Sequence, residues 1–304
     1  MRPRVVPVSA PRLPPPPPPP PLPPLPPLPV WVRALLAVAN RAPPPLARLA
    51  SALCDETLLA WLPRARRAEV TTAIFARQDT YAPGGGTFTR GLFAWERELL
   101  ARPEVPSAGR VLVGGAGGGR EAVALRDLGY EVLAFEPAEP LVRAGVPAVS
   151  ARPGASLVCA SYDDLVRAAG EGTGPLAGLR SGPRIDAVLL GWGSFSHVMA
   201  DAERLAILRA TRVLAPAAPL LLSFDEPTVL DAPGSAASRL RAGLRQLFVR
   251  VGAPTRVREG ERFAPWAGFF RESTAAETTA LAREAGYHVA YVAGAPGRAV
   301  LLPA

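Results

Sequence analysis

The sequence predicts an α/β domain built on a doubly wound, mostly parallel sheet. Three observations predict it: short apolar runs alternate with segments of helical periodicity, a glycine cluster follows the first of these runs, and a carboxylate ends the second. The glycine cluster and the carboxylate fall between Arg110 and Glu136, in RVLVGGAGGGREAVALRDLGYEVLAFE. In an open α/β sheet this order of strand, glycine loop, helix, strand and acid forms a nucleotide-binding unit.

The strands and the helix of this unit follow from its apolar spacing. Val111–Val113 is an apolar run suited to a buried strand, and 132–135 is a second one. Between them, the apolar residues of 121–128 recur at helical spacing, and Gly129 suits the end of that helix. The intervening glycines let the backbone approach a ligand closely, and Glu136 stands where a carboxylate takes ribose hydroxyls.

The spacing of the glycines indicates which nucleoside cofactor is bound. Dinucleotide sites use G-x-G-x-x-G, but here Arg120 stands where the third glycine would be. Gly115, Gly117 and Gly119 instead give G-x-G-x-G, which resembles motif I of the class I S-adenosylmethionine-dependent methyltransferases, V-L-D-L-G-x-G-x-G. The resemblance extends to the C-terminus and implies a Rossmann-like sheet that binds S-adenosyl-L-methionine. One departure is Val113, which replaces the family's usual first-strand acid.

The resemblance also implies the residues that bind the cofactor. Ser161 stands where the family's third strand ends in an acid that binds the adenine amino group. Asp163, two residues later, either compensates for the missing acid or caps the following helix. The full implied set is Gly115, Ala116, Gly117, Gly119, Glu136, Pro137, Ser161, Tyr162, Asp163 and Gly191.

The remaining elements follow the alternating order of an α/β domain. We expect further strands at 157–161, 185–191 and 219–224. A helix at 201–214 separates the last two, and Thr274 with Glu277 has the spacing of a capping box. Two final strands, near 287–292 and 299–302, resemble the antiparallel hairpin that closes the seven-stranded methyltransferase sheet.

The segment after the fourth strand, GWGSFSH, is expected to face the group that receives the methyl, because ligands lie outside the carboxyl ends of parallel strands. It would place Trp192, Ser194, Phe195, Ser196 and His197 beside the acceptor. A sulfonium methyl already has a good leaving group, so the protein mainly aligns the nucleophile, and oxygen or protonated nitrogen also needs a base. His197 is the candidate base; alternatively, it only shapes the acceptor pocket.

Residues 31–100 are predicted to form a separate helical cap or lid. Their apolar spacing is near 3.6 and is broken by Pro43–Pro45 and Pro63. Helical caps of this kind cover the cofactor cleft in small-molecule members of the family that the chain resembles, and Gly84–Gly86 suits a hinge. Aromatic residues at helical spacing also pack in cores. The candidate substrate-wall residues are Tyr81, Phe88, Arg90, Phe93 and Trp95.

Residues 1–30 are predicted to form a proline-rich tail. The unbroken run Pro14–Pro21 favours an extended polyproline segment and excludes helix or sheet. The run either docks into an aromatic groove of a partner or is a biased, disordered tail. Residues 101–304 then make up the S-adenosylmethionine-binding domain. We expect no membrane span, because no window holds about 20 uninterrupted apolar residues.

Composition places the chain among globular proteins, and the distribution of its charges argues against a nucleic-acid partner. The formal charge is +8 and the pI is near 10.5, values that are common in nucleic-acid-binding proteins. The cations are all arginine and are dispersed among acids, so we favour an ordinary solvated surface. Two cysteines make neither a disulfide framework nor a metal site, which fits a metal-free cytoplasmic enzyme.

The favoured function is therefore methyl transfer to an O or N nucleophile of a small molecule. An NAD(P)-dependent oxidoreductase is the main alternative, but the chain lacks the third glycine and, having no lysine, any Tyr-x-x-x-Lys pair. A nucleic-acid methyltransferase and a non-catalytic S-adenosylmethionine-binding protein are further alternatives. The sequence leaves the acceptor and the oligomeric state open.

Deleting residues 1–29 is expected to leave the melting temperature and the affinity for S-adenosylmethionine nearly unchanged, because a polyproline segment has no apolar face to bury. Thermal unfolding and isothermal titration of the truncated chain check this. A clear loss of either property would show that the tail packs on the core.

Overall fold

The computed structural model describes residues 44–227, 235–294 and 296–304, so the predicted tail at 1–30 and the first part of the predicted cap lie outside the described residues. The main feature is a seven-stranded sheet of order β3-β2-β1-β4-β5-β9-β8. The five strands from β1 to β5 pair in parallel, whereas β9 is antiparallel to both β5 and β8. This is the mixed sheet with a C-terminal hairpin that the sequence predicts.

Each expected strand is present, with ends that differ by a few residues from the predicted ones. The strands of the sheet are β1 (Arg110–Gly114), β2 (Glu131–Glu136), β3 (Ala155–Cys159), β4 (Ala187–Leu190), β5 (Leu220–Phe224), β8 (Tyr287–Ala293) and β9 (Gly297–Pro303). The chain order reverses between β1 and β4, and this switch opens a crevice at the carboxyl ends of the strands.

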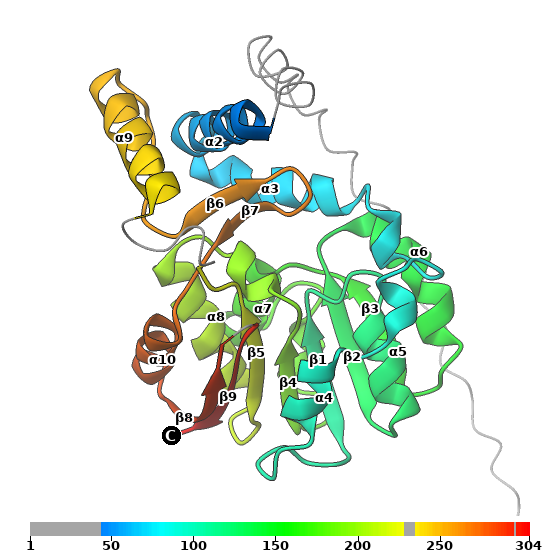
Figure 1. The fold of residues 1–304 in the computed structure, drawn as a ribbon. Helices are drawn as coiled ribbons and strands as arrows, with labels where there is room; N and C mark the ends of the chain where they lie inside the picture. The colour runs from blue at the N-terminus through cyan, green and yellow to red at the C-terminus, as the bar shows by residue number, and fades with distance from the viewer. Residues whose placement is uncertain (1–43, 228–234, 295) are drawn as a thin grey trace, which may run out of the picture.

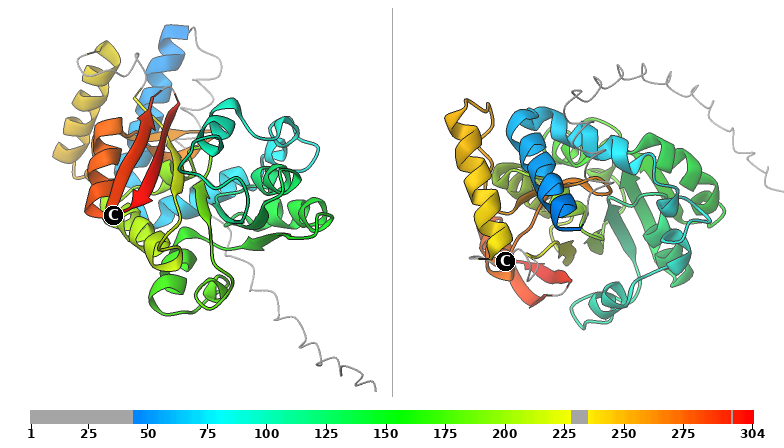
Figure 2. Two further views of the ribbon diagram at one scale, coloured as in Figure 1. Left: turned by 90° about the horizontal axis from the view of Figure 1, so that it is seen from below. Right: turned by 45° about the horizontal axis from the view of Figure 1, so that its top comes forward.

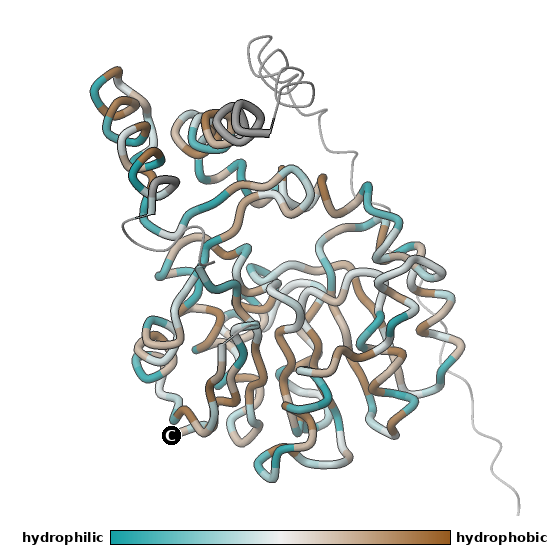
Figure 3. Tube along the Cα trace, in the orientation of Figure 1, coloured by the Kyte–Doolittle hydropathy of each residue, from teal (hydrophilic) through white to brown (hydrophobic). Residues whose placement is uncertain are grey.

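Helices cover both faces of the sheet, and apolar residues concentrate along the strands between them (Figures 1, 2 and 3). Along β1, Val111 and Val113 join one core cluster and Leu112 joins the other, as alternation in a strand requires. One face carries α4 (Ala94–Leu100), α5 (Arg120–Asp127) and α6 (Glu139–Ser150). The opposite face carries α7 (Tyr162–Gly170), α8 (Asp201–Leu214) and α10 (Ala275–Glu284), with the 3₁₀ turn η3 (Ala177–Leu179) beside α7. The predicted capping box is present at α10, where Thr274 Oγ1 accepts from the Glu277 N–H at 3.1 Å.

A second layer lies over the carboxyl ends of the strands and draws on two distant parts of the chain (Figure 1). The first part contains α2 (Pro44–Trp61), α3 (Arg64–Phe75), η1 (Asp79–Tyr81) and η2 (Phe88–Arg90). The second follows β5 and contains α9 (Ala236–Arg250) and the hairpin of β6 (Glu261–Ala264) and β7 (Gly268–Arg271). In both views of Figure 2, α9 lies beside α2. We call this layer the cap.

Buried ion pairs join the two parts of the cap. Glu261 of β6 is fully buried and accepts from Arg67 at 3.1 Å and from Arg64 at 2.9 Å. Glu56 of α2 accepts from Arg245 of α9 at 2.7 Å. Because Glu261, Arg67 and Glu56 lie away from water, each depends on its partner, and the pairs fix how the two parts pack.

Replacing Glu261 with alanine is expected to destabilise the protein by about 3 kcal/mol, since it leaves the buried Arg67 charge unpaired. Urea unfolding of the two proteins gives the difference. The matched control is Glu69→Ala, which breaks the exposed Arg66–Glu69 pair and should cost far less. Equal losses in the two variants would contradict this account of the cap.

Candidate functional site

A cavity of about 710 Å³ lies between the cap and the carboxyl ends of the strands. Its walls come from the loop after β1, the ends of β2 and β3, the segment after β4, and helix α3 of the cap. The cavity therefore coincides with the switch point of the sheet, where open α/β sheets bind ligands. Its volume lies within the usual range for small-molecule sites, roughly 300–1,000 Å³.

The glycine loop turns sharply because three of its residues have positive φ: Gly115 at 68°, Gly117 at 55° and Gly119 at 90°. A Cβ at Gly115 would overlap the side chain of Ser194. At Gly117, by contrast, a Cβ would meet only Tyr81 Cβ, at 3.6 Å, so this side of the loop is open to the cavity. The loop thus exposes bare backbone to a ligand.

Glu136, at the end of β2, is held by backbone donors on both sides. Its Oε2 accepts from the Gly117 N–H at 3.0 Å, and its Oε1 accepts from the Ala138 N–H at 2.9 Å. Burial raises the pKa of Glu136, although both N–H groups act in the opposite direction. Each oxygen keeps a second lone pair, so the carboxylate can still accept hydrogen bonds from a ligand in the cavity.

Polar residues that follow β3 have two roles: some cap helix α7, and others line the cavity. Ser161 caps α7: its Oγ accepts from the Asp164 N–H at 3.2 Å, and the Ser161 N–H donates to Asp164 Oδ2 at 2.8 Å. The helix cap is therefore formed by Ser161 and Asp164, not by Asp163. Asp163 is exposed and is one of the residues that line the cavity.

The segment after β4 presents an aromatic ring to the cavity. Trp192 has φ of 31°, the only positive φ among the described non-glycine residues, and is 44% exposed. Its ring lies 5.5 Å from Tyr81 and 4.8 Å from Phe93, measured between ring centroids. Strained backbone of this kind is found where the surrounding structure fixes a residue for function.

His197 ends the 3₁₀ turn η4 (Ser194–His197) and lines the same cavity. Its Nδ1 lies 2.9 Å from the carbonyl oxygen of Phe269. A carbonyl only accepts, so Nδ1 carries the proton and Nε2 of the neutral ring keeps its lone pair. Burial lowers the pKa of His197 and the nearby Arg204 charge lowers it further, against the Phe269 hydrogen bond. The imidazole is therefore neutral at pH 7.

A buried charge cluster at the start of α5 was missed by the sequence analysis, which noted Arg120 only as a replaced glycine. Arg120 donates to both oxygens of Glu96, at 2.7 and 2.6 Å, and to Glu121. It also donates to the Gly91 carbonyl at 2.5 Å. Burial raises the pKa of Glu121 to about 7. The sequence does carry one signal for this cluster: Arg120 and Glu121 are adjacent at the start of a helix that was expected to pack against the sheet.

The cavity brings together most of the residues that the sequence singled out. Its lining includes Gly115, Ala116, Gly117, Glu136, Pro137, Ser161, Tyr162, Asp163, Tyr81, Phe88, Trp192, Ser194 and His197. The described lining does not include Gly119, Gly191, Arg90, Phe93, Trp95, Phe195 or Ser196.

The residues outside the lining have identifiable positions. Phe195 is 2% exposed and packs in the core, whereas Arg90 is exposed. Phe93 stacks beneath Arg120, with 4.2 Å between the guanidinium carbon and the ring centroid. Asp225, at the end of β5, lines the cavity and was missed by the sequence analysis. Asp225 directly follows an apolar strand, and no sequence motif around it marks it as a site residue.

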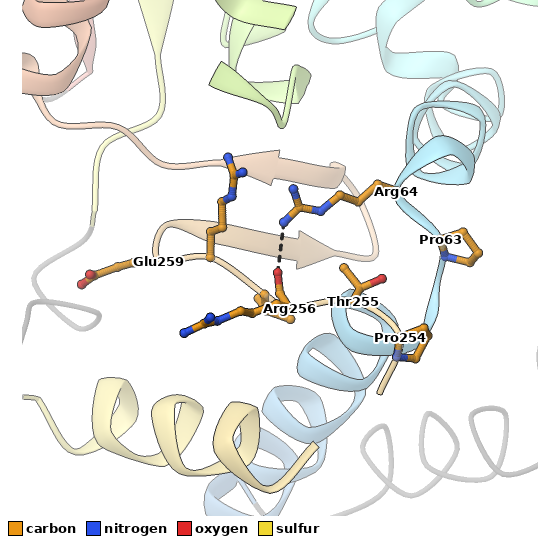
Figure 4. A pocket seen from close by; sticks show the side chains of 8 residues that line it. Pro63, Arg64, Pro254, Thr255, Arg256 and Glu259 are labelled. Atoms are coloured by element: carbon orange, nitrogen blue, oxygen red, sulfur yellow. Dashed lines mark hydrogen bonds between the residues drawn. The ribbon is translucent and has the colours of Figure 1, made fainter. Parts of the chain in front are cut away.

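A second cavity, of about 860 Å³, lies away from the glycine loop (Figure 4). It is bounded by Pro63 and Arg64 at the start of α3 and by residues 254–259. Arg64 lines both cavities and donates to the Arg256 carbonyl at 3.0 Å. Within the described ranges, no group of His, Cys, Asp or Glu is placed to hold a metal ion, and no helix has the length and hydropathy to cross a membrane.

Comparison with known proteins identifies the fold. No protein-family model matches the sequence, and no curated protein matches it. The PH0226 protein of Pyrococcus horikoshii aligns with a TM-score of 0.50 and 16% identity, over 75% of this chain and 97% of its own. The CcbJ methyltransferase of Streptomyces caelestis aligns with a TM-score of 0.43 and 17% identity, over 74% and 90%. A methyltransferase of Methanosarcina mazei gives 0.47 and 17%, over 69% and 96%.

Several structural neighbours are methyltransferases, at 16–24% identity; one of them belongs to calicheamicin biosynthesis and another is a 1,6-didemethyltoxoflavin N1-methyltransferase. The strand order, the antiparallel hairpin and the glycine loop at the switch point agree with this group. The chain has the fold of the class I S-adenosylmethionine-dependent methyltransferases.

Proposed function

We propose that the protein is an S-adenosylmethionine-dependent methyltransferase that methylates an O or N nucleophile of a small molecule. The observation that carries the proposal is the Glu136 carboxylate, held by two backbone N–H groups beside the open side of the glycine loop. A carboxylate at the end of the second strand accepts from the hydroxyls of a ribose. The methyltransferase fold supports the same assignment.

The residues of the cavity fit S-adenosylmethionine. Glu136 would hold the ribose. Asp163, which takes no part in the cap of α7, would accept a hydrogen bond from the adenine amino group. Pro137 and Leu141 supply apolar contact beside them, and Gly117 admits the cofactor without a side chain in the way. When bound, the cofactor supplies a methyl group that is activated by the positive sulfur.

The charge cluster at Arg120 argues against the oxidoreductase alternative. A dinucleotide places its pyrophosphate at the start of the helix that follows the glycine loop. In this protein Arg120 begins that helix, and its buried guanidinium is already paired with Glu96 and Glu121. A pyrophosphate there would lie beside two acidic side chains and would find no free cation in this cluster.

His197 supplies a base within the cavity. The Phe269 carbonyl fixes Nδ1–H, which leaves Nε2 as the proton acceptor. Phe75 packs edge-on against the ring with centroids 5.1 Å apart, which limits its rotation. The neutral imidazole can therefore take a proton from a hydroxyl of the acceptor as the new bond forms, or from an ammonium group before the freed amine attacks.

Transfer of a labelled methyl group tests the proposal as a whole. The protein is incubated with methyl-labelled S-adenosylmethionine and small-molecule extract, and labelled products are identified by mass spectrometry. A labelled small molecule supports the proposal. Tight binding of S-adenosylhomocysteine without transfer to any acceptor would instead indicate a binding scaffold.

Two substitutions test the cofactor site. Glu136→Ala should weaken S-adenosylmethionine binding by about 1–3 kcal/mol, because an ionic hydrogen-bond acceptor is lost. Gly117→Val should weaken it further, since a branched side chain enters the open side of the loop. Isothermal titration measures both. The controls are Glu131→Ala, on the same strand but exposed, and Gly252→Val, which has equivalent positive-φ strain outside the cavity lining. Unchanged affinity in both test variants would contradict the methyltransferase assignment.

Replacing His197 with alanine should lower turnover by roughly 10²–10⁴-fold, the usual contribution of a general base. Cofactor affinity should hardly change, because Glu136 and Asp163 remain. His288→Ala, at an exposed position of β8, is the matched control and should keep full activity.

The pH profile gives a second measure of the same residue. Since burial lowers the pKa of His197 below its ordinary value of 6.5, the base form persists at neutral pH and is lost only as the pH falls through this lowered pKa. Wild-type turnover should therefore fall only on the acid side, and this limb should disappear in His197→Ala. The deficit of the variant should also shrink at high pH, where an acceptor ionises by itself. A decrease of only a few fold would show that His197 acts by shaping the pocket alone.

A further inference from the structure

Five aromatic rings line the cavity beside the glycine loop, and each ring contacts the next one in a row. The order of the row is Trp192, Tyr81, Phe75, His197 and Phe270. The neighbouring centroids lie 5.5, 5.4, 5.1 and 6.5 Å apart in that order. The rings come from α3, η1, β7 and the segment after β4, so the row exists only in the folded protein.

The row begins at the cofactor loop and ends beyond the base. Tyr81 is fixed to the loop, since the Gly118 N–H donates to its carbonyl at 3.2 Å. At the other end, His197 lies between Phe75 and Phe270. Aromatic pairs favour offset and edge-on contacts at these spacings, and a planar ring in the cavity could make the same contacts with the row. The wall therefore suits a flat aromatic ligand.

Charge around the base selects among aromatic ligands. Arg204 is buried, and its guanidinium donates to the Val198 carbonyl at 2.6 Å, to Ser273 Oγ at 2.6 Å and to the Arg271 carbonyl at 3.2 Å, all neutral acceptors. Its charge acts on His197. A cationic amine beside this imidazole would be repelled, whereas an oxygen that becomes negative would be stabilised.

The other charged groups of this compartment leave that selection in place. Arg64 and Arg67 line the cavity from the cap and are both paired with Glu261. The Arg204 charge also lowers the pKa of Asp225, against the effect of burial. The Asp225 carboxylate lies against the backbone of Gly193, where a Cβ would be only 3.4 Å from Oδ2. Glu203 is exposed at the rim. Arg271, Asp201, Glu277 and Asp225 also act on Arg204, but Arg204 is the charge held directly beside His197, because it donates to the carbonyls of Val198 and Ser196 on either side of that residue.

We infer that the methyl acceptor is a planar aromatic compound with an ionisable ring hydroxyl, which packs against the row of rings with its hydroxyl at Nε2 of His197. This inference rests on the proposed function and names its acceptor class. The hydroxyl proton passes to Nε2, the oxygen forms a bond to the methyl carbon, and the carbon–sulfur bond breaks with its electron pair left on sulfur. The imidazolium then returns its proton to solvent.

The test uses 4-nitrophenol, whose ionised form absorbs visible light, and the protein saturated with S-adenosylhomocysteine. We expect the probe to bind at least about tenfold more tightly than cyclohexanol or benzylamine, and to ionise at a lower pH than it does in solution. Phe75→Leu and Trp192→Leu should each weaken binding by about five- to tenfold, the scale of one aromatic contact. Trp61→Leu, at an exposed ring outside both described cavity linings, should bind the probe normally.

His197→Gln separates proton acceptance by His197 from binding of the probe to the row of rings. In this variant the bound probe should stay protonated to higher pH, while its contacts with the row remain. Because Trp192 is 44% exposed, its substitution should disturb folding less and keeps the test valid even if Phe75→Leu fails to fold.

The outcomes distinguish this inference from the function on which it rests. Binding of S-adenosylhomocysteine together with equal affinities for the three probes, or with preference for benzylamine, would overturn the acceptor class and leave the methyltransferase proposal standing. Failure to bind S-adenosylhomocysteine would overturn both.

Discussion

The contact between the Glu136 carboxylate and the Gly117 N–H fixes the backbone of the glycine loop, and the geometry of the site depends on it. Strands β1 and β2 pair in register up to Gly114 and Phe135, so the loop leaves β1 directly beside the end of β2. The carboxylate is buried, so the hydrogen bonds that water would donate to it come instead from the backbone N–H groups of Gly117 and Ala138. A ligand with two hydroxyls can join this arrangement without disturbing it.

The cap is tied to the same loop by two further contacts. The Gly118 N–H donates to the Tyr81 carbonyl, and Arg120 joins the start of α5 to Glu96 and to the Gly91 carbonyl. These bonds place Tyr81 of the cap, and the segment that joins the cap to α4, against the loop, and the ion pairs of Glu261 and Glu56 hold the two parts of the cap together. The row of rings that crosses the cavity is therefore anchored at the loop and at the hairpin of β6 and β7.

The sequence predicts the sheet well because its signals are local. Apolar runs locate the strands, and the Thr274–Glu277 spacing locates the start of α10. It does not predict α9 or the hairpin of β6 and β7, because their stability comes from partners in α2 and α3 that are far away in the chain, as in the pair of Glu261 with Arg67. Nor does spacing separate Trp192 from Phe195: a short 3₁₀ turn sends the second ring into the core and leaves the first in the cavity. Asp225 and Arg120 gain their importance from burial and neighbours that only the folded chain provides.

Isothermal titration of the full chain with S-adenosylhomocysteine and, separately, with NAD tests the central claim most directly. The claim is that the glycine loop and Glu136 form a nucleoside site for S-adenosylmethionine, and that the Arg120 ion pairs at the start of α5 disfavour a dinucleotide. The account predicts submillimolar binding of S-adenosylhomocysteine and no heat of binding with NAD. Binding of NAD without binding of S-adenosylhomocysteine would contradict it.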